Sequence, residues 1–152
     1  MNLSLMIELI SIVTETMKYS YCQGVSEYKT LTMNYDELCK QVFDLDPQVR
    51  FAGIANSKGV LVAGGQRDNV ESVLANDDLK MSIHYALQKR DLYTNLAYKL
   101  GYERSSITEY DVVTMISIPI NSNELFLIST EPRADYLKII DYVRSTVDSQ
   151  KD

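Results

Sequence analysis

Apolar and polar residues repeat at two different periods along this chain, and the changes of period mark its elements. The first clear helix is predicted to begin after Asn34, whose side chain suits an N-cap and whose spacing to Glu37 is that of a capping box. It is predicted to end at Asp46, because a residue that precedes a proline disfavours the α region. Its apolar positions recur at helical spacing: Leu38, Val42 and Leu45.

Two apolar runs follow, at residues 50–55 and 60–63, and the turn residues 56–59 separate them. Gly59 supplies the positive φ that such a turn needs, so the segment is predicted to be a β-hairpin. Both runs are nearly continuous in apolar residues, so both faces of both strands are expected to be covered. Residues 64–68 are predicted to form a loop.

A long helical pattern covers residues 77–100. Asp77 or Asp78 is expected to cap this helix, and Gly101 is expected to end it. The apolar stripe shifts position near residues 90–91, which indicates a break there.

The last third of the chain returns to strand periodicity. Residues 112–120 and 124–130 alternate around a turn at residues 121–123, and a shorter strand around residues 102–108 is expected to pair with the first of these. Pro132 is predicted to open the final helix. The buried stripe expected for this helix consists of Tyr136, Ile140, Val143 and Val147.

Composition narrows the classes of function. The 15 lysines and arginines against 21 aspartates and glutamates give a net charge of −6, which argues against nucleic acid and anionic membranes as partners. Cys22 and Cys39 have no metal-binding or redox spacing, so reduced cysteines in a cytoplasmic protein are expected, with a single disulfide as the alternative. The only histidine, His84, excludes paired-histidine zinc motifs. No catalytic residue, metal or cofactor is predicted.

The first 32 residues differ in pattern from the rest. Residues 3–17 carry one narrow polar stripe and predict a helix that must cover this domain, a second copy or a partner. The polar residues that follow this helix are predicted to form a linker. In the alternative interpretation Met33, directly before the first core helix, marks the native start. The expected division is an N-terminal segment at 1–32, a domain at 33–149 and a tail at 150–152.

The order of a helix, two strands, a helix, three strands and a helix resembles the roadblock/longin/profilin-like architecture. Residues 51–63 are similar to the opening hairpin of roadblock domains, with its Asp/Asn-x-x-Gly turn. At sequence level the chain is similar to an uncharacterised family of ammonia-oxidising archaea, whose recurrent segments correspond to residues 51–53, 64–65, 79–82 and 107–110. The resemblance implies an α+β fold with a five-stranded, mostly antiparallel sheet. The first and last helices would cover one face and the middle helix the other.

The same resemblance implies a role in regulation or signalling. Roadblock-like domains are usually non-catalytic, dimerise through the middle helix and a sheet edge, and serve as platforms for small GTPases or motor complexes. In this chain the corresponding helix would span residues 78–100.

Two groups of residues are candidates for a site. Gly64, Gly65 and Arg67 could hold an anion with backbone N–H groups and a guanidinium, although a purely structural loop would use the same residues. The chain has 11 tyrosines, and several fall on the middle helix and the strand after it, where amphipathic rings suit an interface or a pocket. His84 is expected on the surface. The residues expected at an interface or pocket are Ile83, Tyr85, Leu87, Tyr93, Tyr98, Tyr102 and Tyr110.

Three functions stay open on these grounds. The first is a non-catalytic, homodimeric interaction module that regulates or scaffolds a partner protein. The second is a small-molecule-sensing domain with a pocket between the sheet and the helix at residues 78–100. An enzyme that uses His84 or Arg67 is the third.

Overall fold

The structure, a computed structural model, describes residues 33–151. The helix predicted over residues 3–17, the linker after it and Cys22 lie outside the described residues. The elements in chain order are α2 (Tyr35–Leu45), β1 (Val49–Asn56), β2 (Leu61–Gln66), α3 (Asn76–Thr94), α4 (Ala97–Leu100), β3 (Ser106–Glu109), β4 (Thr114–Pro119), β5 (Glu124–Thr130) and α5 (Tyr136–Ser149).

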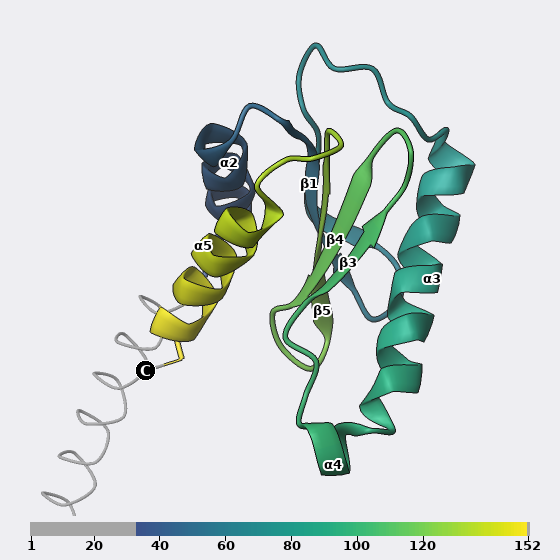
Figure 1. The fold of residues 1–152 in the computed structure, drawn as a ribbon, viewed down its shortest axis with the longest axis vertical. Helices are drawn as coiled ribbons and strands as arrows, with labels where there is room; N and C mark the ends of the chain where they lie inside the picture. Colours follow the sequence, from purple (N-terminus) through teal and green to yellow (C-terminus); the bar gives the residue numbers. More distant parts are fainter. Residues whose placement is uncertain (1–32, 152) are drawn as a thin grey trace, which may run out of the picture. The chain divides into compact units, whose positions relative to one another are not determined.

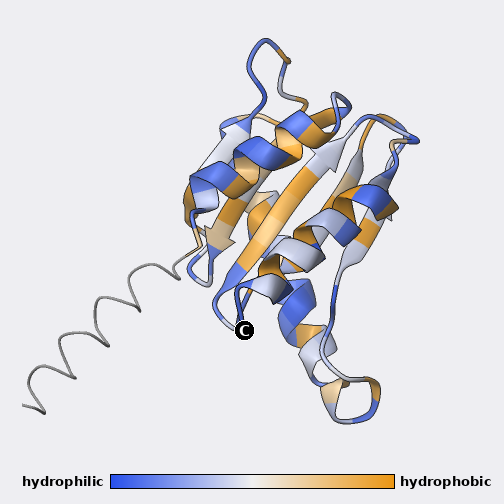
Figure 2. Ribbon diagram, turned by 90° about the vertical axis from the view of Figure 1, so that its left-hand side faces the viewer, coloured by the Kyte–Doolittle hydropathy of each residue, from blue (hydrophilic) through white to orange (hydrophobic). Residues whose placement is uncertain are grey.

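The five strands form one antiparallel sheet in the order β2-β1-β5-β4-β3. Figure 1 shows α2 and α5 together on one face of this sheet and α3 on the other. In Figure 2, which looks onto the α2 and α5 face, apolar strands lie beneath two helices whose outer sides are largely hydrophilic. The predicted α+β fold, with a five-stranded sheet and helices on both faces, is therefore confirmed.

The boundaries of α2 follow from its terminal residues, as predicted. The Asn34 Oδ1 accepts a hydrogen bond from the backbone N–H of Glu37 at 3.1 Å, which satisfies one of the free donors of the first turn. The helix ends at Leu45, and Asp46 before the proline is extended, with φ of −147°.

The predicted hairpin joins β1 to β2. Gly59 has a φ of +78°, and the Asn56 Oδ1 accepts the backbone N–H groups of Lys58 and Val60 at 3.0 and 3.1 Å. The expectation that both strands are covered on both faces is wrong for β2. This strand lies at an edge of the sheet, and its Val62 side chain is 45% exposed.

The prediction of a loop over residues 64–68 is also wrong in part, because Gly64, Gly65 and Gln66 belong to β2. Gly64 pairs with Gly53 of β1, at a φ of +75°. A Cβ at position 64 would lie 2.1 Å from the Ala52 carbonyl oxygen and 2.8 Å from the Cys39 Sγ. The glycine therefore continues the strand where the backbone passes too close to β1 and α2 for any side chain.

The long helix departs from its prediction at two points. It begins at Asn76 with no side-chain cap, so Asp77 and Asp78 occupy its first turn. It breaks after Thr94, not near residues 90–91, because the Arg90 guanidinium donates to the carbonyls of Glu124 and Asn121 and holds the helix against the β4–β5 turn. Gly101 ends α4 at a φ of +78°, as predicted.

The final helix starts later than predicted. Arg133 has a φ of +66°, a left-handed conformation that no helix can include, so Pro132 lies in the preceding turn. Asp135 caps the helix instead, because its Oδ1 accepts the Lys138 N–H at 3.2 Å. The buried residues of α5 are Ile139, Ile140, Val143 and Val147, which include most of the predicted stripe.

Candidate functional site

A groove with a volume of about 790 Å³ lies between α3 and the sheet. Its position follows from where the helix rests. Ile83, the one buried residue of α3, packs with Leu125 and Leu127 of β5 and with Phe51 of β1. The helix therefore sits over the β1 and β5 side of the sheet, and the β4 and β3 side of the same face is left without a close partner.

The floor of the groove consists mostly of small hydroxyl residues. Side chains alternate between the two faces of a strand, so the positions that pair with Leu127 and its neighbours share the α3 face. These positions are Ser106, Thr108, Met115, Ser117 and Ser129. Serine is too short to reach the helix as Leu125 does, and the space between them stays open.

A chain of polar contacts crosses this floor from α3 to β4. The Lys89 ammonium donates to the Ser106 Oγ at 3.2 Å, and the Oγ atoms of Ser106 and Ser117 lie 2.9 Å apart. The ammonium also lies 5.9 Å from the centroid of the Tyr93 ring, a cation–π distance. No carboxylate oxygen of residues 33–151 lies within 4.0 Å of the Lys89 Nζ. The groove thus contains a positive charge with no acidic partner in the described chain.

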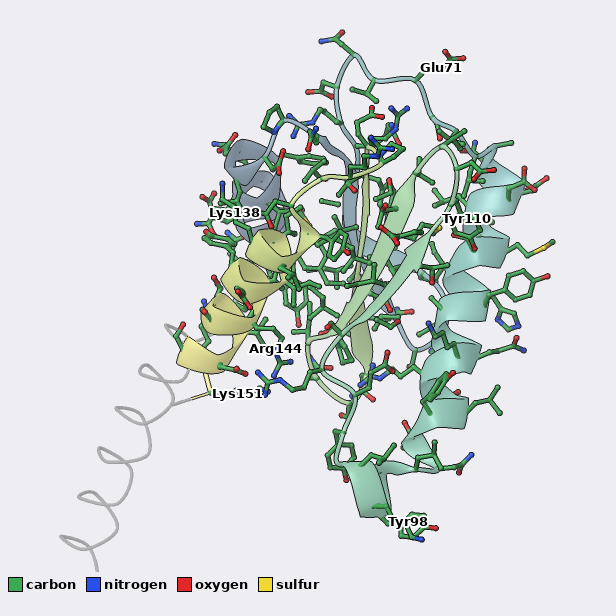
Figure 3. All side chains as sticks on the ribbon, viewed as in Figure 1. Glu71, Tyr98, Tyr110, Lys138, Arg144 and Lys151 are labelled. Atoms are coloured by element: carbon green, nitrogen blue, oxygen red, sulfur yellow. The ribbon has the colours of Figure 1, made fainter. Side chains whose placement is uncertain are left out.

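The opposite end of the groove is closed by paired groups. The Arg50 guanidinium forms an ion pair with Glu131 and donates to the Glu71 carbonyl at 2.8 Å. Glu71 lies in the long loop before α3 (Figure 3). The Gln66 amide donates to the Val70 carbonyl of the same loop at 3.3 Å. The positive charge of Arg50 is therefore neutralised by Glu131.

The predicted interface or pocket residues divide into three groups. Ile83 and Leu87 pack against the sheet and belong to the core, as Ile83 is 3% exposed. Tyr85 and Tyr110 line the groove at its rim, where they are 59% and 57% exposed. The third group extends beyond the groove toward α4, with Tyr98 at its far end (Figure 3), and consists of Tyr93, Tyr98 and Tyr102.

Arg67 is held by backbone carbonyls. Its Nε donates to the Val49 carbonyl at 2.5 Å, and its Nη2 donates to the Phe43 and Asp46 carbonyls at 2.7 and 2.8 Å. The guanidinium also lies 4.9 Å from the centroid of the Phe43 ring. These contacts tie the end of β2 to the C-terminal end of α2, whose carbonyls attract a cation. The anion site at Gly64, Gly65 and Arg67 stays a prediction.

Two groups on α2 have perturbed acidities. Burial, together with the charge of Asp36, raises the pKa of the Cys39 thiol to about 11. Burial also raises the pKa of Tyr35 to about 12, helped by its hydrogen bond to the Glu124 carboxylate. Both changes keep the groups neutral at ordinary pH, so Cys39 is an unreactive thiol. His84 lies exposed on α3, in the surface position that was expected.

Sequence reasoning missed Lys89, Ser106 and Ser117 as members of one site. The available signal was the presence of hydroxyl residues at α3-facing positions of two predicted strands, where apolar residues would be expected. Within residues 33–151 no cluster of three or more histidine, cysteine or acidic side chains could hold a metal ion. No helix of the described part is long and apolar enough to cross a membrane.

Solved structures share the fold at low sequence identity. A Roadblock/LC7 domain from Streptomyces avermitilis is 15% identical with a TM-score of 0.59, over 78% of this chain and 96% of that one. The gliding protein MglB from Thermus thermophilus is 11% identical with a TM-score of 0.60, over 75% and 82%. A structure described as MglB with tetrameric arrangement is 12% identical with a TM-score of 0.61, over 75% and 85%.

These likenesses establish a roadblock-like fold and nothing about activity. No curated protein matches the chain. A family model described as "Family of unknown function (DUF6659)" matches residues 29–148. The match covers most of the sequence, and the chain therefore belongs to the DUF6659 family.

Proposed function

We propose that this protein is a non-catalytic interaction module that forms a homodimer through α3 and the β3 edge of the sheet. The observation that carries the proposal is a set of large, exposed side chains, mostly leucine and tyrosine, on α3, on α4 and directly after α4. Large exposed apolar surfaces on soluble domains mark interaction sites, and tyrosine is enriched in such interfaces. The most exposed members are Tyr85 at 59%, Leu92 at 69%, Leu100 at 77%, Tyr98 at 79% and Tyr102 at 84%.

The edge of the sheet supports the same surface. β3 has only four residues and pairs with β4 alone, so its outer backbone groups have no partner strand in the described chain. An unpaired edge is a template for another strand, and a two-fold axis would bring two such edges together in one isologous interface. The likeness to a tetrameric arrangement of MglB also favours self-association of this fold.

A regulatory role is the second part of the proposal, and the likeness of the fold to Roadblock/LC7 and MglB structures supports it. His84 lies exposed on α3, outside the residues that line the groove. In this proposal the module acts by binding a partner protein. The small GTPase that the roadblock resemblance implies is the partner class to test, by titrating a purified GTPase against the assembled dimer.

Sedimentation equilibrium of the full chain over micromolar concentrations tests the dimer. Tyr93→Glu places a charge on the exposed α3 surface and is expected to weaken self-association at least tenfold. Leu137→Glu is the matched control, because Leu137 is 63% exposed on α5, at the other face of the sheet. A monomer at every concentration, or equal weakening by both substitutions, would contradict the proposal.

A further inference from the structure

We propose that the groove between α3 and the sheet binds an amphipathic monocarboxylate, a molecule with one carboxylate on an apolar body, and that Lys89 holds the carboxylate. The inference does not depend on the homodimer, because every residue that it uses belongs to one chain. It names a ligand class for the second function that the sequence left open.

The charge of Lys89 selects an anion. The Nζ has three N–H donors, of which one is used by Ser106, and no carboxylate of the described residues neutralises it. The ammonium of a half-buried lysine on an apolar groove gains most from an anionic partner that also completes its hydrogen bonds. A single free charge at this end matches a monoanion.

The two serines extend the donor set toward the ligand. Lysine can only donate, so the Ser106 oxygen accepts from Lys89, and either serine hydroxyl can donate in the 2.9 Å contact between them. An acceptor bound in the groove favours the arrangement in which Ser106 donates to Ser117. The Ser117 hydroxyl then has its proton available for an acceptor in the groove. A carboxylate with two oxygens can accept from Lys89 and from Ser117 together, which a neutral alcohol cannot do as well.

The rest of the groove suits an apolar body of some length. Its lining is predominantly apolar, with Phe51, Leu61, Leu79 and Leu127 on the core side and Met115 and Val113 across from them. Asp78 and Lys89 both line the groove and lie eleven positions apart on α3, so it extends about 16 Å along the helix axis. The volume of about 790 Å³ falls within the range of small-molecule sites.

The far end of the groove fixes the orientation. Asp78 adds a negative charge there, and the Arg50 guanidinium is already paired with Glu131. A carboxylate would be repelled by the first and would find no free charge on the second. The acid group is therefore expected at the Lys89 end and the apolar end at the loop before α3.

Methyl NMR of the full chain labelled at its methionines tests the site, with decanoate, decanol and decylammonium as probes below their micelle-forming concentrations. Met81 and Met115 line the groove at its rim and floor and serve as reporters. Decanoate is expected to shift both signals in a saturable way and to bind at least tenfold more tightly than decanol. Decylammonium is expected to bind more weakly than either.

Paired lysine variants separate charge recognition from fold effects. Lys89→Gln is expected to weaken decanoate binding at least tenfold and to leave decanol binding unchanged. Lys99→Gln is the matched control, because the Lys99 ammonium also lies over a tyrosine ring, at 5.7 Å from the Tyr98 centroid, but is not part of the groove. Ser117→Ala is expected to weaken decanoate binding by a smaller factor.

Three results would overturn the inference. Decanol could bind as tightly as decanoate. The Lys89→Gln and Lys99→Gln variants could also show an equal loss of affinity for decanoate. The Met81 and Met115 signals could also respond to protein concentration and ignore decanoate, which would assign the groove to a second copy of the chain.

Discussion

α2 and α5 bury three and four side chains against one face of the sheet, whereas the longer α3 buries only Ile83 against the other. The strand residues under α2 and α5 are closed off as well: Ile54, Ile118 and Phe126 have no exposed surface. On the α3 face, small hydroxyl residues leave a groove, and the outer side of the helix exposes tyrosines and leucines.

The difference indicates that one face of the sheet stabilises the domain and the other is available for binding. Each fully buried large apolar side chain contributes about 1.5–3 kcal/mol, so the α2 and α5 face supplies most of the stability. α3 needs only a few contacts to stay in place, and its remaining surface is free to bind other molecules. The following predictions use paired substitutions, one member of each pair in a tightly packed position.

The largest effect is expected from cavity formation on the closed face. Phe126→Ala should lower the free energy of unfolding by about 4 kcal/mol, because a phenylalanine with no exposed surface leaves a void. Tyr85→Ala on α3, where the side chain is 59% exposed, should change the free energy of unfolding of the monomeric chain by less than about 0.5 kcal/mol. Urea unfolding of both variants checks the pair, and similar losses would mean that the faces do not differ as described.

A smaller effect is expected from two glycines with similar positive φ values. Gly64 and Gly101 have φ values of +75° and +78°, but only Gly64 has other atoms in the way of a Cβ. Gly101→Ala should cost about 1 kcal/mol from φ alone, whereas Gly64→Ala should cost about 3 kcal/mol because it also forces β2 away from Ala52 and Cys39. Thermal or urea unfolding measures both, and equal costs would show that the close approach at Gly64 is absent.

The last effect is confined to alkaline pH. The folded-state pKa of Cys39, about 11, and that of Tyr35, about 12, are both above their ordinary values, so the folded state binds more protons in this range than the unfolded state. The contribution of these two groups to the free energy of unfolding should be fully present below pH 9. It should be lost as the pH rises toward 11 and 12.

Variants assign this loss to its two sources. Cys39→Ala should make the decline between pH 9 and 11 shallower, and Tyr35→Phe should do the same between pH 10 and 12, whatever each substitution does to stability at neutral pH. The urea midpoint as a function of pH is the measurement. An unchanged slope in both variants would show that other groups cause the loss.

Much of the fold could be predicted because local chemistry decides it. The N-cap at Asn34, the stop before Pro47, the turn at Gly59 and the strand at residues 124–130 each depend on neighbouring residues alone. Two of the errors occurred where a distant contact decides. The sequence around Gly64 predicts a loop, but the close approach of Cys39 on α2 requires a glycine at this point of the strand. The helix continues past residues 90–91, where Arg90 is hydrogen-bonded to the β4–β5 turn.

The candidate site was harder to predict for the same reason. The tyrosines on α3 could be recognised from composition and helical spacing. The groove depends on how far α3 shifts toward β1 and β5, which no local pattern encodes. Lys89, Ser106 and Ser117 come together only through this packing, and a lysine and two serines have no significance as a motif when they are far apart in sequence.

Amide hydrogen exchange of the full chain at low and high protein concentration tests the central claim most directly, because it reports on each face separately. If α3 and the β3 edge form the binding surface, the higher concentration should slow exchange in residues 85–110 and leave α5 unchanged. Slower exchange in α5, or no dependence on concentration at residues 85–110, would contradict the account.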